Sequence, residues 1–391
     1  MRKMIGLLMA AAVLATGTAT AQPIKPGTPS ILRWTLEQQT EWYPAIETVY
    51  PTATVRRGDT VRPLPKGDSA VLDKLTWSHA DKSWTVDDYM KAYNVSGLMV
   101  VKGGKVMLER YGLGRKPEDR WISFSVTKSI TSTLVGAAIK DGKIKSIDDQ
   151  VTSYIPELKG SAYDGVSIRN LLTMSSGVKW NEDYSDANSD VARSGRQILE
   201  PGVNPIVSYM KALPRANEPG TKFTYNTGET DLVGILVSNA VGKSLSQYAS
   251  EKLWQAYGMQ RDATWIVDRA GHERGGCCMS MTLGDYARVG QFMLDGGVAR
   301  GQQILPDGWI QQATTAQITN GAPPAGYGYF WWLGQGGPYQ ASGIFGQSIS
   351  VIPDERLVIV VNSAWPSATG RELFVARSAF INAVRAAAKG L

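Results

Sequence analysis

The hydrophobic and polar positions of this chain predict strands at both ends of its main part and helices between them. From Gly97 to Glu109, two apolar runs flank a Gly-Gly pair, a pattern typical of a β-hairpin with a tight turn. A helix rich in small residues is predicted from about Ser125 to Lys140, and a glycine soon follows it. Apolar runs of strand length return late in the chain, at 327–333, 347–352 and 357–362.

Helical patterns dominate the middle of the chain. They extend over about 146–260, and a final helix is predicted over 371–388. Strands, then a helical block, then more strands predict an α/β (α+β) fold, in which an antiparallel sheet flanked by helices is interrupted by an inserted all-helical lobe. Active sites commonly lie in the cleft between such lobes. We therefore expect one main domain over 81–391 that contains this helical lobe.

The first residues have the pattern of an export signal. Met1-Arg2-Lys3 is a charged start, an apolar run covers 5–15, and Ala19-Thr20-Ala21 matches a small-x-small cleavage site. That run is too short to cross a bilayer, and no later run reaches the ~20 apolar residues that a transmembrane helix needs. We expect a signal peptide over 1–21, no stable membrane anchor, and a periplasmic or secreted mature protein that begins near Gln22.

Residues 22–80 have many prolines, charges and aromatic residues but little clear periodicity. We expect them to form an N-terminal extension that wraps the main domain. Loss of Arg2 and Lys3 with the signal peptide would lower the net charge from +6 to +4. No block of basic residues is present, so we expect no nucleic-acid partner.

Histidine and cysteine are scarce. Only His79 and His272 occur, so a Ser-His-Asp triad would have to use one of them, and no Gly-x-Ser-x-Gly motif is present. Cys277 and Cys278 are adjacent, which is closer than ordinary disulfide geometry prefers, so we expect two free, buried thiols. No spacing typical of a zinc site occurs. We expect neither a metal nor another cofactor.

A serine and a lysine three residues apart are the main chemical signal. Ser125 and Lys128 share one face of the predicted helix, one turn apart, at its beginning. Burial can lower the pKa of such a lysine until it accepts the serine proton. The same Ser-x-x-Lys spacing occurs at Ser176, in a predicted loop, and at Ser208, in an amphipathic helix. The context therefore favours Ser125 as the nucleophile of a Ser-Lys acyl-transfer enzyme.

From about 95 to 387, the chain resembles the serine β-lactamase and penicillin-binding-protein superfamily in the order of its motifs. The likeness is to the class C-like branch, and within it to 6-aminohexanoate-dimer hydrolases and related esterases. The motifs that carry it are Ser125-Val-Thr-Lys128, Ser167 to Gly177, Glu218 to Tyr225, the Tyr-x-x-x-x-Thr-Asp-x-x-Gly run from Tyr225 to Gly234, Gly276 to Ala287, Tyr327 to Trp332, and Ala341 to Gln347.

This resemblance implies roles for individual residues. Ser125, Lys128 and Tyr225 would be catalytic, and the backbone N–H groups of Ser125 and Ile344 would form the oxyanion hole. The titrations of Lys128 and Tyr225 would be coupled, so the sequence assigns the base to neither alone. Four further residues would bind substrate: Tyr184, Ser342, Gly343 and Trp331. Consecutive strand residues face opposite ways, so only one of Trp331 and its neighbour Trp332 can line the cleft.

Two departures from the β-lactamase pattern bear on the substrate. The Tyr-x-Asn motif here reads Tyr225-Asn226-Thr227, and Ala341 stands where penicillin-binding enzymes carry a lysine that binds a substrate carboxylate. The resemblance therefore implies an exported serine hydrolase that cleaves a small-molecule amide or ester through an acyl-serine intermediate. The alternatives are a D,D-carboxypeptidase or class C-like β-lactamase, and a non-catalytic binding protein with this fold. The sequence does not determine the oligomeric state.

Overall fold

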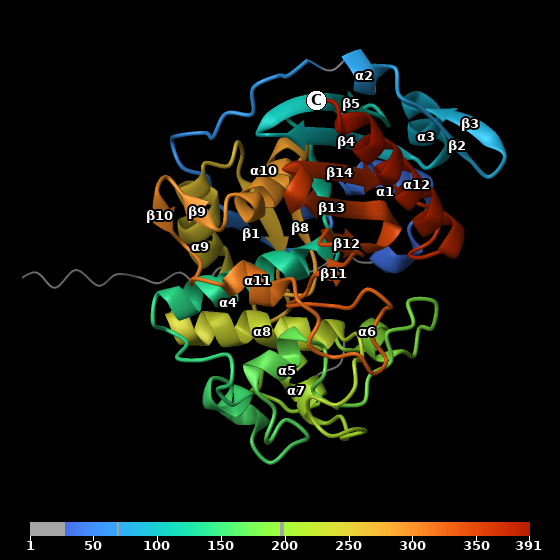
Figure 1. Cartoon of the computed structure of the whole chain (residues 1–391). Helices are drawn as coiled ribbons and strands as arrows, with labels where there is room; N and C mark the ends of the chain where they lie inside the picture. Colours follow the sequence, from blue (N-terminus) through green and yellow to red (C-terminus); the bar gives the residue numbers. More distant parts are fainter. Residues whose placement is uncertain (1–27, 69, 196–198) are drawn as a thin grey trace, which may run out of the picture.

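The computed structural model describes residues 28–68, 70–195 and 199–391 (Figure 1). The signal peptide predicted over 1–21 lies outside these residues. The described strands are β1 Thr52–Val55, β2 Thr76–His79, β3 Lys82–Thr85, β4 Val95–Lys102, β5 Lys105–Tyr111, β6 Arg120–Ile122, β7 Ala263–Ile266, β8 Met279–Thr282, β9 Val298–Ala299, β10 Gln302–Gln303, β11 Trp332–Leu333, β12 Tyr339–Gly343, β13 Gln347–Ile352 and β14 Leu357–Ser363.

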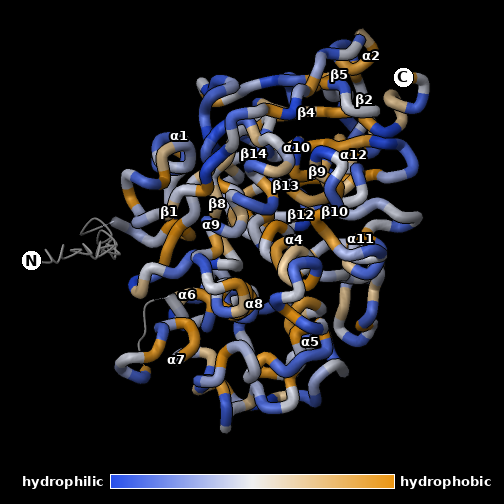
Figure 2. The backbone as a smooth tube through the Cα atoms, turned by 90° about the vertical axis from the view of Figure 1, so that its left-hand side faces the viewer, coloured by the Kyte–Doolittle hydropathy of each residue, from blue (hydrophilic) through white to orange (hydrophobic). Residues whose placement is uncertain are grey.

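The largest sheet has six strands in the order β11-β12-β13-β14-β4-β5, and each neighbouring pair is antiparallel. Its central strands β13, β14 and β4 are buried at almost every position, because both faces of the sheet are covered. In β14, Val358 and Val360 belong to the core on one face, while Leu357 and Ile359 belong to the core on the other. Figure 2 shows the hydrophobic stretch of β4 in orange.

Helices cover both faces of this sheet. α10 and α4 pack on one face, and α12 contributes Phe380 and Val384 to the core on the other. The described α-helices are α1 Leu36–Trp42, α2 Ala70–Asp73, α3 Val86–Ala92, α4 Val126–Lys140, α5 Ile168–Leu172, α6 Asp190–Arg193, α7 Pro205–Lys211, α8 Thr227–Val241, α9 Leu245–Ala249, α10 Leu283–Leu294, α11 Trp309–Ala313 and α12 Arg371–Ala388. None of the helices in the described ranges is long and apolar enough to cross a bilayer.

A helical region adjoins the large sheet. Between β6 and β7 the described elements are all helical, from α4 to the π-helix Ser250–Gln255. In Figure 1, α4 and α8 lie between the large sheet above and α5 and α7 below. The strands of the sheet therefore come from both sides of a long helical segment of the sequence, as the predicted α/β (α+β) fold requires.

A second sheet joins the N-terminal extension to the site. Its order is β1-β7-β8-β6, so Thr52–Val55 of the extension pair with Ala263–Ile266. β6 pairs with β8, and the chain runs from β6 directly into α4. This sheet thus places the extension close to the beginning of α4.

Most of the predicted elements are confirmed. The hairpin is β4–β5, with Gly103 and Gly104 at positive φ in its turn, and the final helix begins and ends as predicted. The strand predicted over 327–333 is wrong, because only Trp332–Leu333 forms one. Upstream, Tyr329 N–H donates to the carbonyl of Ala313 and Phe330 N–H to that of Leu172, so helix ends satisfy this backbone instead of a strand partner.

Candidate active site

The loop between β6 and α4 presents Ser125 at the start of a buried helix. The backbone N–H of Ser123 donates to the carbonyl of Met279 on β8 at 2.8 Å. Phe124 has φ +43°, in the left-handed region, and Ser125 follows at the N-cap position of α4. A serine at this position usually accepts a backbone hydrogen bond. The Ser125 side chain accepts none, so its hydroxyl is available for chemistry.

Lys128 holds its amine against that hydroxyl. Its Nζ donates to Ser125 Oγ at 3.0 Å and to the carbonyl of Gly276 at 2.8 Å, and the residue is 1% exposed. Burial lowers the pKa of Lys128 to about 8, while the charges of Glu182 and Asp231 oppose this shift. A substantial fraction of the amine is therefore uncharged near pH 8 and can accept a proton.

Tyr225 completes a group of three side chains. Lys128 Nζ lies 5.2 Å from the centre of the Tyr225 ring, and that ring stacks on Trp332 with centres 5.5 Å apart. Burial, followed by the charge of Glu182, raises the pKa of the Tyr225 phenol, although a hydrogen bond with Ser125 lowers it. The phenol therefore stays protonated at neutral pH and is suited to donate a proton.

The end of β12 approaches the same loop closely. A Cβ atom added to Gly343 would lie 2.4 Å from the carbonyl oxygen of Ser123, so only glycine permits this approach. Ile344 follows Gly343 and lines the same cavity as Ser125. Ser125 and Ile344 thus border one space. Their role as an oxyanion hole stays a prediction.

Buried side chains support this turn from behind. Phe345 has φ +59°, and its ring centre lies 5.3 Å from that of Phe124. Tyr43, from the N-terminal extension, packs edge-on against Phe124 at 5.3 Å. Gln347 Nε2 donates to the carbonyl of Phe345 at 3.0 Å, and its Oε1 accepts from Trp121 Nε1 at 3.1 Å. One amide side chain thus joins the turn after β12 to the strand that precedes Ser125.

Glu182 is a residue of this site that the sequence analysis missed. Its carboxylate accepts from the Tyr184 hydroxyl at 2.7 Å and from the backbone N–H of Thr227 at 3.0 Å. Trp180 Nε1 and the Thr227 hydroxyl also donate to it. This negative charge raises the pKa values of both Lys128 and Tyr225. No sequence motif indicated Glu182, because Thr227, whose N–H and hydroxyl donate to it, is distant in the sequence.

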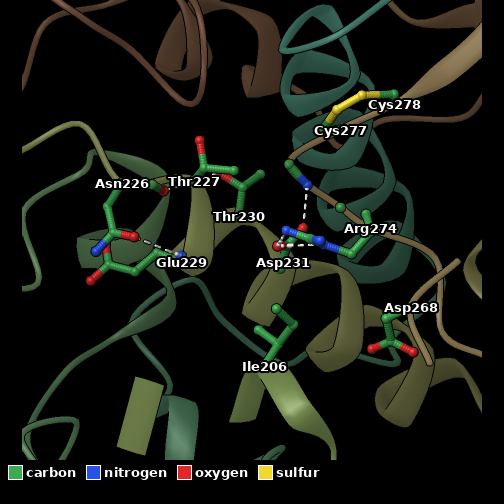
Figure 3. A network of polar contacts seen from close by, with 12 residues as sticks. Ile206, Asn226, Thr227, Glu229, Thr230, Asp231, Asp268, Arg274, Cys277 and Cys278 are labelled. Carbon is green, nitrogen blue, oxygen red and sulfur yellow. Dashed lines mark hydrogen bonds and ion pairs between the residues drawn. A yellow bond between two sulfur atoms is a disulfide. The ribbon is translucent and has the colours of Figure 1, made fainter. Parts of the chain in front are cut away.

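An ion pair fixes the position of Gly276, whose carbonyl accepts a hydrogen bond from the Lys128 amine. Arg274 Nε donates to Asp231 on α8 at 2.8 Å, and the other Asp231 oxygen accepts from the backbone N–H of Gly276 at 2.9 Å. Figure 3 shows the guanidinium of Arg274 directed at Asp231. The Thr-Asp-x-x-Gly run contained Asp231, but nothing in the sequence indicated its partners. Through Gly276, this pair orients the main-chain acceptor of the Lys128 amine.

A cavity of about 680 Å³ opens beside Ser125. Tyr184 and Ile344 also line it, so two of the predicted site residues share this space with the nucleophile. Ser342 is turned elsewhere: its hydroxyl accepts from the guanidinium of Arg377 on α12 at 3.0 Å. Substrate contacts by Tyr184, Ser342 and Gly343 stay predictions. The apolar lining includes Ile31, Leu32, Phe124, Val191, Ile266 and Val267.

The structure corrects the prediction for Trp331. Its side chain is fully buried and packs edge-on against Tyr339, so it cannot contact substrate. Trp332 is half-buried and stacks on Tyr225 instead. Trp331 directly precedes β11, so its ring packs against Tyr339 whereas the Trp332 ring packs against Tyr225.

The prediction of two free thiols is also wrong. Cys277 and Cys278 form a disulfide, visible above Arg274 in Figure 3, and the peptide bond between them is cis. The prediction rested on the short distance between adjacent cysteines, which is below the distance that ordinary disulfide geometry prefers. Both cysteines line the cavity next to Gly276.

The chain belongs to the beta-lactamase family, whose model matches residues 85–379. The 6-aminohexanoate-dimer hydrolase of Paenarthrobacter ureafaciens is 32% identical over 356 residues, which cover 87% of this chain and 89% of that protein. A structure from Bacillus anthracis, provisionally described as a 6-aminohexanoate-dimer hydrolase, aligns with a TM-score of 0.80 at 22% identity, over 92% of this chain and 98% of the other. A family VIII carboxylesterase aligns with a TM-score of 0.61 at 15% identity, over 83% and 99%.

These matches confirm the predicted family and the fold. The protein is a serine hydrolase of the β-lactamase and penicillin-binding-protein superfamily, and it is similar over most of its length to a 6-aminohexanoate-dimer hydrolase.

Proposed function

We propose that the protein hydrolyses small amides or esters through an acyl-serine intermediate. The observation that carries this proposal is the buried amine of Lys128, 3.0 Å from Ser125 Oγ, whose pKa burial lowers to about 8. An uncharged amine at hydrogen-bond distance can take the serine proton as a bond to the substrate carbonyl forms. The similarity to a 6-aminohexanoate-dimer hydrolase and to a carboxylesterase supports amides and esters as the substrate class.

The proposed reaction has two steps. Ser125 Oγ bonds to the carbonyl carbon while its proton moves to Lys128, and the negative oxygen accepts from the backbone N–H groups of Ser125 and Ile344. Tyr225 donates its proton to the leaving nitrogen or oxygen as the bond to the acyl carbon breaks, and Lys128 returns a proton to the phenolate. Water then attacks the acyl-serine, and its proton reaches Ser125 through the same two groups.

Ala341 bears on the alternative activities. Its side chain is fully buried in the apolar core, so this position offers no cation to a β-lactam or stem-peptide carboxylate. We therefore expect slow nitrocefin hydrolysis and no stable penicillin adduct. Rapid turnover of nitrocefin would favour the β-lactamase or D,D-carboxypeptidase alternative.

The test of the acyl-serine mechanism is direct. A fluorophosphonate probe should label the wild-type protein at Ser125, and Ser125→Ala should abolish both labelling and turnover of short nitrophenyl esters. Ser176→Ala and Ser208→Ala are matched controls, because both serines belong to Ser-x-x-Lys sequences outside the proposed site. Labelling that persists in Ser125→Ala would overturn the assignment.

Export is a second part of the proposal. It rests on the charged start, short apolar run and Ala19-Thr20-Ala21 site of the sequence. Fractionation of the producing cells should find a protein that begins near Gln22 in the periplasm or the medium. A cytoplasmic protein that retains Met1 would contradict it.

A further inference from the structure

One wall of the cavity lies outside the family domain. The beta-lactamase match begins at residue 85, but residues 28–32, Tyr50 and Pro51 line the cavity together with Ser125 and Ile344. The N-terminal extension therefore contributes directly to the space beside the nucleophile. A substrate group in this space would contact a surface that the family domain alone does not provide.

Several contacts hold this wall in place. Trp34 is 4% exposed, and its Nε1 donates to the carbonyl of Pro29 at 3.1 Å. The Trp34 ring packs edge-on against Trp42 at 4.8 Å and lies 6.1 Å from the ring of Tyr50. The Tyr50 phenol in turn interacts with the backbone of Ile31. These contacts order the segment before any substrate binds.

The extension is also joined to the loop that contains Tyr184. The Arg33 guanidinium donates to the carbonyl of Ser185, which directly follows the lining residue Tyr184. Ile31 and Leu32 pack against the apolar cluster that contains Phe124 and Ile344. Ile31 and Leu32 thus add apolar surface to the cavity that Ser125 lines.

The position of Tyr225 indicates which part of a substrate occupies the cavity. In the proposed mechanism the leaving group lies beside Tyr225, and neither Tyr225 nor its stacked partner Trp332 lines the cavity. Tyr184 stands at the border: its ring lines the cavity, while its hydroxyl is turned to Glu182. The cavity therefore extends away from the leaving group and towards the acyl group.

The charged lining residues do not require a charged substrate. Arg274 is paired with Asp231, and the Asp268 carboxylate accepts from the backbone N–H groups of Ala270 and His272. Arg269 is exposed to solvent. An aliphatic chain could therefore cover the apolar part of the lining, to which Ile31 and Leu32 belong.

We propose that Ile31 and Leu32 form the acyl-binding wall of the enzyme and set the length of the aliphatic acyl chain that it accepts. This inference rests on the proposed acyl-serine mechanism, which places the acyl group on Ser125 next to Ile344. Unbranched aliphatic acyl groups, whose apolar surface would be buried against this wall, are the expected class.

Two series of esters test the proposal. The first varies the acyl chain from acetyl to octanoyl with nitrophenol as the common leaving group, and the second varies the alcohol with one acyl group. Ile31→Trp fills the cavity, so kcat/KM for hexanoyl and octanoyl esters should fall about tenfold or more relative to acetyl, since single methylenes in apolar pockets discriminate by this order. Leu36→Trp is the matched control, because Leu36 belongs to the same segment but is 44% exposed.

Each outcome decides the proposal. If Ile31→Trp changes kcat/KM only in the alcohol series, the cavity binds the leaving group. If its preference among acyl chains equals that of the wild type, Ile31 does not contact the acyl chain. If Ile31→Trp does not fold, Ile31→Ala provides the converse test. In this variant kcat/KM for octanoyl esters should rise relative to that for acetyl esters, and an unchanged ratio would overturn the inference. Wild-type protein that hydrolyses neither these esters nor the corresponding nitroanilide amides would instead contradict the proposed function.

Discussion

Gly343 and Ser123 are so close that a Cβ atom at position 343 would lie 2.4 Å from the Ser123 carbonyl oxygen. The end of β12 and the loop before Ser125 can therefore approach only if residue 343 has no side chain. This approach brings Ile344 into the lining of the cavity beside Ser125, although the two segments are separated by more than half of the sequence.

Gly343→Ala should therefore reduce activity severely. The added methyl group would push β12 away from Ser123 and displace the Ile344 N–H, and loss of one oxyanion donor typically lowers kcat by about 100- to 1,000-fold. Ester kinetics would measure the effect, with thermal melting as a check on folding. Gly390→Ala is the control, because a Cβ there meets no atom within 4 Å. Near-normal kcat in Gly343→Ala would argue against this oxyanion hole.

The pH dependence of kcat/KM should report the Lys128 amine. Activity requires its uncharged form, so the rate should rise with pH through an apparent pKa of about 8 and level off above it. The charge of Glu182 raises the pKa of Lys128, so Glu182→Gln should move this rise to lower pH. A loss of activity with an unmoved pH profile would show that Glu182 acts only by holding its loop.

Trp331 and Trp332 should differ in the kind of effect they produce. Trp332→Ala removes the ring stacked on Tyr225, so it should lower kcat/KM by about tenfold while changing stability little. Trp331→Ala opens a hole in the core and should cost about 3–5 kcal/mol of unfolding free energy. Ester kinetics and urea unfolding of both variants test this, and the reverse pattern would restore Trp331 as the substrate contact.

Glu229 should make the folded state less stable as the pH rises. The residue is 1% exposed, and burial raises its pKa from 4.5 to about 8, although hydrogen bonds from Ser176 and Tyr163 oppose this shift. Between these two values the folded state keeps a proton that the unfolded state has lost, so stability falls with pH across this window. At about 1.36 kcal/mol per unit, the full loss approaches ~5 kcal/mol.

Glu229→Gln should remove most of that fall, because the amide does not titrate. Urea unfolding of the wild-type and variant proteins at pH 5 and pH 8.5 measures the difference. The variant should be the more stable protein at the higher pH. Parallel pH dependence in the two proteins would show that Glu229 is already ionised in the folded state.

The sequence by itself determined the features that depend on neighbouring residues. The spacing of Ser125 and Lys128 is local, because one helical turn brings residues i and i+3 together wherever the helix lies. The hairpin β4–β5 and the boundaries of α12 likewise follow from short-range periodicity and a Gly-Gly turn. The motifs in their order were sufficient to indicate the family, and Tyr225 was found through them.

Only the tertiary structure decided which distant residues complete the site. Glu182 meets Thr227, Arg274 meets Asp231, and Ile31 lines the cavity of Ser125 because separate segments pack together. A periodic pattern assigns a residue to a face, but it does not say which other segment covers that face. For the same reason, Trp331 and Trp332 were indistinguishable in the sequence, and the burial of one against the core became apparent only in the folded chain.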